Sequence, residues 1–149
     1  MEFKDSVRAI LDGKGSSVHS ISPDHSVYEA IERMSQIGVG ALVVQEEGKM
    51  VGILSERDYA RKIVLQGRTS RDALVRDIMT QQVIVASLDD TVDDCMKIFA
   101  KHNIRHLPVV ENERTVGVIT ASDLVKWIMS RQNDTIEHLE HYIASGYIR

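Results

Sequence analysis

The chain carries one seven-residue phrase twice, as Gly52-Ile53-Leu54-Ser55-Glu56-Arg57-Asp58 and again as Gly117-Val118-Ile119-Thr120-Ala121-Ser122-Asp123. Each copy begins with glycine, continues with two apolar residues and a hydroxyl residue, and ends in aspartate. When residues 18–64 are moved forward by 65 positions, they align without a gap on residues 83–129 and the two phrases coincide. An internal repeat of this kind predicts two copies of one structural unit that share a core.

The composition is that of a small globular protein. A chain of 149 residues has room for one compact domain or for two small units, and the repeat favours the second. No apolar run approaches the roughly 20 residues that span a bilayer, and residues 1–5 lack a secretory signal, so we expect a soluble protein. The single Cys95 excludes an intramolecular disulfide and suits a reducing cytoplasm. A net charge of −4 gives no general attraction to nucleic acids or acidic membranes, so any anion would be held by local geometry.

Hydrophobic spacing predicts the order strand, helix, strand, strand, helix in each copy. Ser26-x-x-Glu29 is a capping-box signature ahead of a helix with one apolar stripe. Apolar runs on either side of Glu46-Glu47-Gly48 predict a β-hairpin. The expected elements are strands 18–21, 41–44 and 50–54 with helices 27–37 and 55–64 in the first copy, and strands 83–86, 107–110 and 116–119 with helices 91–99 and 124–128 in the second.

Helical spacing also extends beyond the two copies. Residues 3–12 predict a short leading helix, and Ile136, Leu139, Tyr142 and Ile143 predict a terminal helix that docks on another surface. We therefore divide the chain into an N-terminal helix and lead-in (1–16), a first repeat (17–66), a linker (67–78), a second repeat (79–130) and a C-terminal helix (131–149).

The hydroxyl and the aspartate of each phrase admit two interpretations. They follow a buried strand and open a helix, where a sugar-phosphate can meet the helix N-terminus. They can equally be helix caps, with the hydroxyl at the N-cap and the acid in the first turn. The two roles can coexist, and the repeat favours ligand contact.

With its two phrases, its hairpins and the segment Ile104-Arg105-His106-Leu107-Pro108-Val109-Val110, the chain resembles a tandem pair of CBS domains, a Bateman module, over residues 15–130. The resemblance implies an α/β fold: two CBS repeats related by pseudo-two-fold symmetry, with extra helices at both ends. It implies two clefts between the copies for an adenosine-containing ligand, with AMP first and ATP, ADP, S-adenosylmethionine or NAD as alternatives. It also implies a flat, disc-like homodimer.

In one cleft, the resemblance assigns Asp123 to the ribose hydroxyls and Thr120 to ribose or phosphate. Arg105 and His106 would face the phosphate, for which arginine is the preferred partner. The other copy would hold the adenine. The remaining residues assigned to this cleft are Lys14, Val18, His19, Val39, Gly40 and Ala41 on the adenine side, with Pro108 and Ser122.

The mirror cleft would use Ser55 and Asp58 for the sugar. Gly40-Ala41 stands here where the second copy has Arg105-His106, so the cationic positions carry no charge. We therefore expect the Thr120/Asp123 cleft to be the tighter site. The base side would be formed by Met79, Val83, Ile84 and the segment Ile104 to His106, and Arg57, Arg61 and Lys62 are the substitute cations.

No set of residues predicts catalysis. The sequence shows no nucleophile beside a base and no Rossmann glycine fingerprint, and Cys95 lies on an apolar helix face. His138 and His141 lack a third metal ligand fixed by a motif. We therefore expect a regulatory module that binds an adenine nucleotide, forms a homodimer and acts on an unidentified protein, without an enzyme activity, a metal, a nucleic acid or a membrane. The alternatives are a ligand-free structural or partner-binding module that acts through its dimer surface, and an enzyme that turns over the bound nucleotide.

Overall fold

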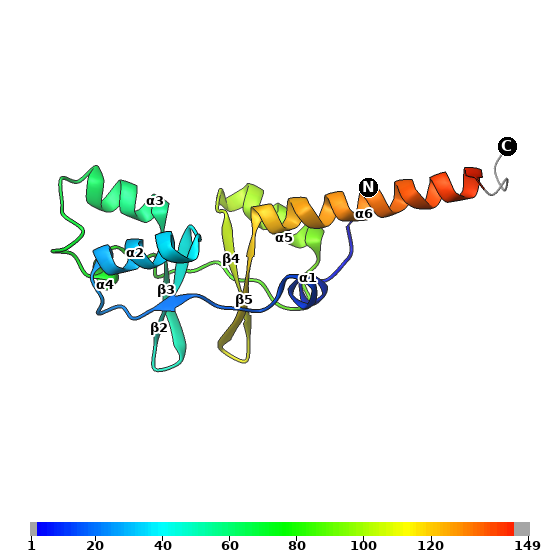
Figure 1. Cartoon of the computed structure of the whole chain (residues 1–149). Coiled ribbons are helices and arrows are strands. Elements are labelled where there is room, and N and C mark those ends of the chain that lie inside the picture. Colours follow the sequence, from blue (N-terminus) through cyan, green and yellow to red (C-terminus); the bar gives the residue numbers. More distant parts are fainter. Residues whose placement is uncertain (1–2, 145–149) are drawn as a thin grey trace.

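Two similar units lie side by side, each with a β-hairpin below and helices above in the view of Figure 1. The computed structural model describes the backbone of residues 3–144 and the side chains of that range other than those of residues 134–135, 137–139 and 141–144. The elements are α1 (Val7–Lys14), β1 (Ser20–Ile21), α2 (Val27–Ile37), β2 (Ala41–Glu46), β3 (Lys49–Ser55), α3 (Glu56–Tyr59), the π-helix η1 (Ala60–Val64), α4 (Val75–Ile78), α5 (Val92–His102), β4 (His106–Glu111), β5 (Arg114–Thr120) and α6 (Ala121–Ala144).

The two units contain the same β-hairpin, with the same register irregularity at equivalent positions. β2 and β3 form one antiparallel hairpin, and β4 and β5 form the other. The register shifts between Val44 and Gln45 in the first hairpin and between Val109 and Val110 in the second, at positions 65 residues apart. The predicted fold class, an α/β chain of two equivalent repeats with extra helices at both ends, is confirmed.

The opening strand differs between the repeats. In the first, β1 pairs in parallel with β2, and Val43 N donates to His19 O at 3.0 Å. In the second, the predicted strand 83–86 is reduced to a single bridge between Ala86 and Val109. Pro108 occupies the place of Val43 and has no N–H to donate, so the ladder cannot extend beyond Ala86.

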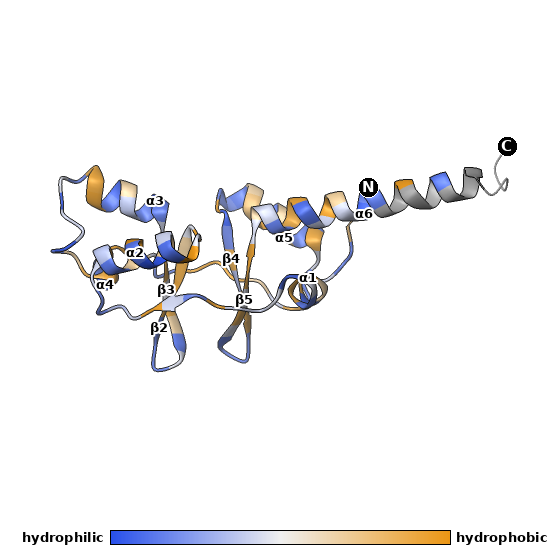
Figure 2. Cartoon of the chain, in the orientation of Figure 1, coloured by the Kyte–Doolittle hydropathy of each residue, from blue (hydrophilic) through white to orange (hydrophobic). Residues whose placement is uncertain are grey.

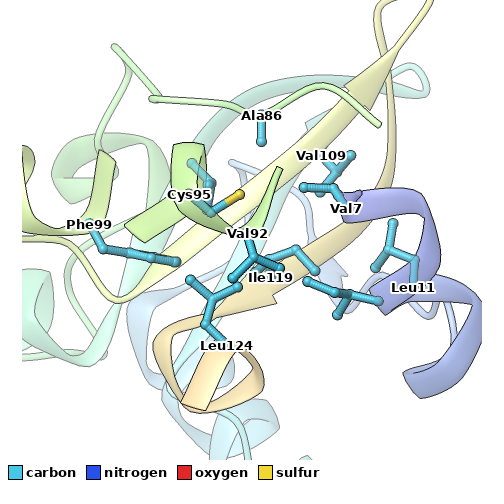
Figure 3. Close-up of a cluster of buried hydrophobic side chains, with 11 residues drawn as sticks. Val7, Leu11, Ala86, Val92, Cys95, Phe99, Val109, Ile119 and Leu124 are labelled. Atoms are coloured by element: carbon cyan, nitrogen blue, oxygen red, sulfur yellow. The ribbon is translucent and has the colours of Figure 1, made fainter. Parts of the chain in front are cut away.

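The hydrophobic core of each repeat includes a helix that precedes the other repeat in the sequence. Val7, Ile10 and Leu11 of α1 are buried in the core of the second repeat, as Figure 3 shows for Val7 and Leu11. Val75 and Ile78 of α4 are buried in the core of the first repeat. We call this exchange of helices the crossing. It holds the two repeats together, because each core contains residues from the segment that precedes the other repeat.

Backbone hydrogen bonds fix the crossing in the same way on both sides. Val7 N donates to Asp90 O at 2.8 Å, and Val75 N donates to His25 O at 2.9 Å. The acceptors lie 65 residues apart and the donors 68, so the stretch between α4 and the second repeat is three residues shorter than the stretch between α1 and the first repeat.

The helix boundaries correct three predictions. The leading helix begins at Val7 rather than at residue 3, because the Ser6 side chain caps it by accepting from Ala9 N at 3.2 Å. The predicted linker contains α4. The helix after Ser55 runs to Val64 as predicted, but its second half is a π-helix.

α6 merges the last predicted helix of the second repeat with the C-terminal one. It runs without a break from Ala121 to Ala144, and Figure 1 shows it extending well past α5. The predicted docking of Leu139, Tyr142 and Ile143 concerns side chains outside the described part of the chain. None of the helices described in residues 3–144 is both long and apolar enough to cross a bilayer.

Candidate functional site

Two cavities lie next to each other between the repeats. The first has a volume of about 660 Å³ and the second about 410 Å³, both in the range of small-molecule sites. They share Gly40, Ile53, Arg105 and His106 as a common wall. Gly40 and Arg105, which occupy equivalent positions in the two copies, are therefore brought together at the boundary of the two cavities.

The first cavity combines an apolar wall with cations. Lys14 and Arg105 line it together with His19 and His106, and no carboxylate of the described residues is among its lining side chains. Such a cavity suits a flat apolar group attached to an anion. The apolar wall is formed by Val39, Ala41, Leu42, Val43, Ile53 and Val118.

Asp123 lies behind this wall and is already paired. Its Oδ2 accepts from Thr120 N at 2.8 Å, while Thr120 Oγ1 accepts from Asp123 N at 3.0 Å, which is a reciprocal helix cap. Lys14 Nζ donates to the same Oδ2 at 2.6 Å and to Val118 O at 2.9 Å. Burial raises the pKa of Asp123, but the hydrogen bonds from Lys14 and Thr120 outweigh it and hold the pKa below its usual value. Asp123 is thus an anion whose Oδ1 has no hydrogen bond from any described residue.

His106 lies against the backbone of the opposite repeat. A Cβ on Gly40 would lie 3.4 Å from the imidazole atoms Cε1 and Nε2, so the ring packs closely against Gly40. Burial lowers the pKa of His106, and the carboxylate of Glu56 opposes that shift without cancelling it. His106 is therefore a neutral hydrogen-bonding group at pH 7, and Arg105 carries the charge at this wall.

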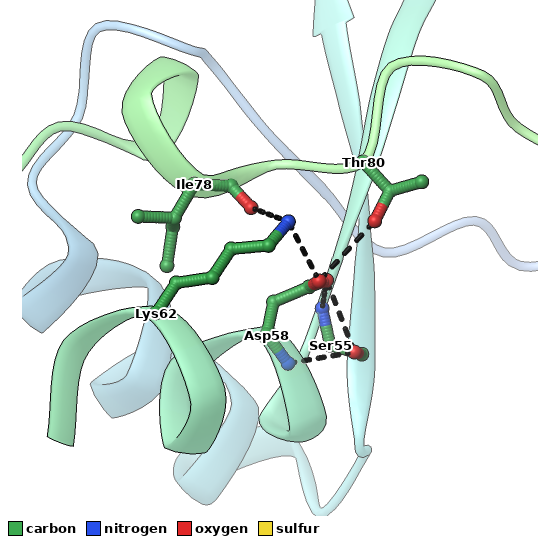
Figure 4. Close-up of polar contacts among 5 residues, drawn as sticks. All are labelled: Ser55, Asp58, Lys62, Ile78 and Thr80. Carbon is green, nitrogen blue, oxygen red and sulfur yellow. Dashed lines mark hydrogen bonds and ion pairs between the residues drawn. The ribbon is translucent and has the colours of Figure 1, made fainter. Parts of the chain in front are cut away.

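Glu56 and Asp58 both line the second cavity, and the carboxylate of Asp58 is bonded at both oxygens (Figure 4). Asp58 Oδ2 accepts from the backbone N of Ser55 at 2.9 Å and from its Oγ at 3.1 Å. Asp58 Oδ1 accepts from Thr80 Oγ1 at 3.2 Å and forms an ion pair with Lys62 Nζ at 3.2 Å. A ribose in this cavity would have to displace internal partners, which the first cavity does not require at Asp123 Oδ1.

Two of the substitute cations have other roles. Lys62 Nζ donates to Ile78 O at 2.8 Å as well as pairing with Asp58, so these contacts would have to open before Lys62 could meet a phosphate. Arg57 donates from Nη1 to Asn103 O at 2.7 Å, which links the first repeat to the second along this cavity. Arg61 lines the second cavity without a described ion pair.

Most residues assigned from the sequence are brought together at the two cavities. The first is lined by Lys14, His19, Val39, Gly40, Ala41, Arg105, His106, Thr120 and Ser122, with Asp123 directly behind them, and the second by Ser55, Arg57, Asp58, Arg61, Ile84, Ile104, Arg105 and His106.

Besides Asp123 and Lys62, three assigned residues do not line either cavity. Met79 packs under Gly52, where a Cβ would come within 2.9 Å of its sulfur. Pro108 is buried in β4, and its carbonyl accepts from Ala86 N at 2.9 Å. Val18 is half-buried beside the first cavity without lining it.

Sequence reasoning missed Thr80, Gln82, His102 and Asn103 of the second cavity. Thr80 is placed there by an antiparallel bridge to Ile53, a pairing between distant residues that no local pattern indicates. Among the described residues, the structure contains no group of three His, Cys, Asp or Glu side chains that could hold a metal ion. The side chains of His138 and His141 lie outside that part of the chain.

Comparisons with known proteins agree with this arrangement. The family model described as CBS domain matches residues 14–65 and 75–130. The mitochondrial CBS domain-containing protein CBSX3 of Arabidopsis thaliana is 34% identical over 147 residues, which cover 93% of this chain and 71% of that protein. The crystal structure of the CBS domain NE2398 superposes with a TM-score of 0.81 at 39% identity, covering 84% of this chain and 98% of that one. A protein with CBS domains from Burkholderia ambifaria gives a TM-score of 0.82 at 38% identity, covering 85% and 96%.

Proposed function

Because this chain belongs to the CBS domain family and carries two such domains in tandem, we propose that it is a regulatory module that binds an adenine nucleotide in the first cavity, with AMP as its first candidate ligand. CBS domain pairs typically bind adenosine-containing ligands. ATP, ADP, S-adenosylmethionine and NAD share the adenosine group and are the alternatives. We propose no catalytic step.

One observation carries the proposal: the first cavity is lined by an apolar wall and by the cations Lys14 and Arg105, and the carboxylate of Asp123 lies directly behind Thr120 of that lining. The base would lie against Val39 and Ile53, and the ribose hydroxyls would donate to Asp123. The phosphate would meet Arg105, whose guanidinium matches phosphate geometry. Charge-assisted contacts of this type are the stronger hydrogen bonds, so two of them can orient the ligand.

Lys14 already forms an ion pair with the carboxylate that the ribose would use. It forms an ion pair with Asp123 in the free protein, and its side chain is 35% exposed. A ligand that reaches Asp123 therefore either shares the carboxylate with Lys14 through the open Oδ1 or displaces the ammonium, which can then turn to the phosphate. In both cases Lys14 remains a cation of the same cavity.

Ligand binding should stabilise the fold, which is the test of the proposal. The cavity exists only when both repeats are folded, so a ligand at a hundredfold excess over its Kd should add about 2.7 kcal/mol to the free energy of unfolding. We expect the melting temperature to rise by several degrees with AMP. Differential scanning fluorimetry with AMP, ADP, ATP, S-adenosylmethionine, NAD and GMP measures it. A melting temperature unchanged by every adenosine ligand would favour the ligand-free structural alternative.

Arg105 should distinguish phosphate from adenosine. Arg105→Ala removes the charge at the shared wall, so AMP binding should weaken by roughly tenfold to a hundredfold, as for a charged hydrogen bond of about 1.5–3 kcal/mol. Adenosine has no phosphate, and its affinity should change by less than about threefold. Isothermal titration calorimetry with both ligands measures the difference. Arg61→Ala, at the second cavity, is the matched control, and equal losses for AMP and adenosine in Arg105→Ala would place the phosphate elsewhere.

A further inference from the structure

α6 has two apolar faces, and only one of them is covered by its own chain. Leu124 is 3% exposed, and Trp127 and Ile128 pack against the core of the second repeat. Val125 and Met129 point away from that core, with 56% and 57% of their surface exposed. At 100° per residue, the two faces lie about a third of a turn apart on the helix.

The covered face ends before the helix does. Trp127 Nε1 and Arg131 Nε both donate to Asp5 Oδ2 at 2.9 Å, which fixes α6 to the segment before α1. Among the described side chains, Arg131 is the last on α6 that bonds to another element. Figure 1 shows the helix continuing beyond this point past the rest of the molecule.

The uncovered face continues onto this extension. Val125, Met129, Gln132 and Ile136 follow one another at alternating steps of four and three residues, and Ile136 is 52% exposed. In the sequence, Leu139 and Ile143 continue the same alternation. This heptad spacing is that of a coiled-coil seam, in which the apolar positions of one helix insert between those of a second. Figure 2 shows apolar bands alternating with polar ones along α6.

The charges beside this seam are self-complementary. Lys126 and Glu140 are both exposed and lie on the same flank of the seam, 14 residues or about 21 Å apart along the helix. If a second α6 lies antiparallel across the first, Lys126 of each copy meets Glu140 of the other. In a parallel pair the Lys126 and Glu140 side chains of the two copies would lie on opposite flanks of the seam, so this ion pair would not form.

We propose that the uncovered face of α6, formed by Val125, Met129, Gln132 and Ile136, binds α6 of a second copy of this chain in an antiparallel helix pair. The heptad spacing supplies the apolar seam, and the Lys126–Glu140 pairing selects both the partner and its direction. The family resemblance implies a flat, disc-like homodimer, whereas this proposal places a dimer interface on the uncovered face of α6. It does not depend on the nucleotide.

Charge exchange tests the direction of the pair. Exposed ion pairs change an equilibrium by up to about fivefold each, and the two-fold axis repeats the pair. Lys126→Glu and Glu140→Lys should therefore each weaken the dimer by roughly tenfold at low salt, and the double variant should restore it. Sedimentation equilibrium at 50 μM protein and below measures the dimer dissociation constant. Failure of the double variant to restore the dimer would overturn the antiparallel arrangement.

A change on the seam tests the surface itself. Ile136→Glu should raise the dimer dissociation constant by more than tenfold, whereas Ser130→Glu, which adds the same charge off the seam, should leave it within about twofold. Both residues are exposed, so circular dichroism should show the fold unchanged. A monomeric wild type would overturn the proposal. So would a dimer that tolerates Ile136→Glu but dissociates with Val64→Glu, because that result would place the interface on the exposed face of η1 as in a disc.

Discussion

Asp123→Asn should weaken AMP binding by roughly tenfold to a hundredfold, while Asp58→Asn should change it by less than about threefold. Asparagine keeps an oxygen that can accept from Thr120 N, so the helix cap is largely retained. What it removes is the negative charge that would receive the ribose hydroxyls. The expected loss is that of one charged hydrogen-bond partner, about 1.5–3 kcal/mol.

The difference between the two aspartates follows from their partners. Asp58 has donors on both oxygens, from Ser55 on one side and from Thr80 and Lys62 on the other. Asp123 has its donors on Oδ2, from Thr120 and Lys14. Only Asp123 can therefore accept from a ribose without losing a described contact.

Calorimetric titration of AMP into the wild type and the two variants measures this ranking. Each variant should first be shown to unfold at a urea midpoint close to that of the wild type, so that binding is compared between folded proteins. Equal losses for the two variants would mean that both cavities bind AMP alike. A larger loss for Asp58→Asn would reverse the assignment of the site.

Gly52→Ala should destabilise the protein by about 1–3 kcal/mol, more than Gly117→Ala at the equivalent position of the second repeat. A Cβ on Gly52 would come within 2.9 Å of Thr80 O, a backbone atom that accepts from Ile53 N. Relief of this clash would require the segment after α4 to move away from β3. That movement would also disturb the position of Thr80 beside Asp58.

Gly117, the equivalent glycine of the second repeat, lies against a side chain and not against a backbone atom. A Cβ on Gly117 would lie 2.7 Å and 2.8 Å from the two terminal methyl carbons of Leu11, which can rotate away more readily than a backbone carbonyl. Urea unfolding followed by circular dichroism at 222 nm measures both variants. A free energy of unfolding lower for Gly117→Ala than for Gly52→Ala would show that the packing of α1 tolerates less change than that of α4.

The segments that precede the two repeats each contribute both to a cavity and to a hydrophobic core. α1 brings Lys14 to Asp123 in the first cavity, and the segment after α4 brings Thr80 to Asp58 in the second. Each cavity thus receives a residue from the lead-in of a repeat, and each lead-in packs into the core of the other unit. A substitution that loosens α4 should therefore affect both the stability of the chain and the second cavity.

The repeat in the sequence determined the fold class, because a gapless 65-residue offset carries the strands, helices and caps of one unit onto the other. It also determined that Arg105 and His106 share a cavity with Thr120, since their places within the repeat are known once the family resemblance is accepted. The start of a helix that is capped by its own side chain could also be predicted from the sequence. Ser26 and Thr91 cap their helices as their patterns indicate.

Only the tertiary structure decided which charges are already neutralised. Lys14 was placed at the cleft from the sequence, but its pairing with Asp123 joins residues 109 positions apart. Lys62 looks like a free cation in the sequence and is bound to Asp58 and Ile78. The crossing of α1 and α4 and the loss of a strand at Pro108 also depend on which distant backbone groups meet. Local patterns specify each element, whereas ion pairs and strand partners depend on distances that exist only after the two units have packed.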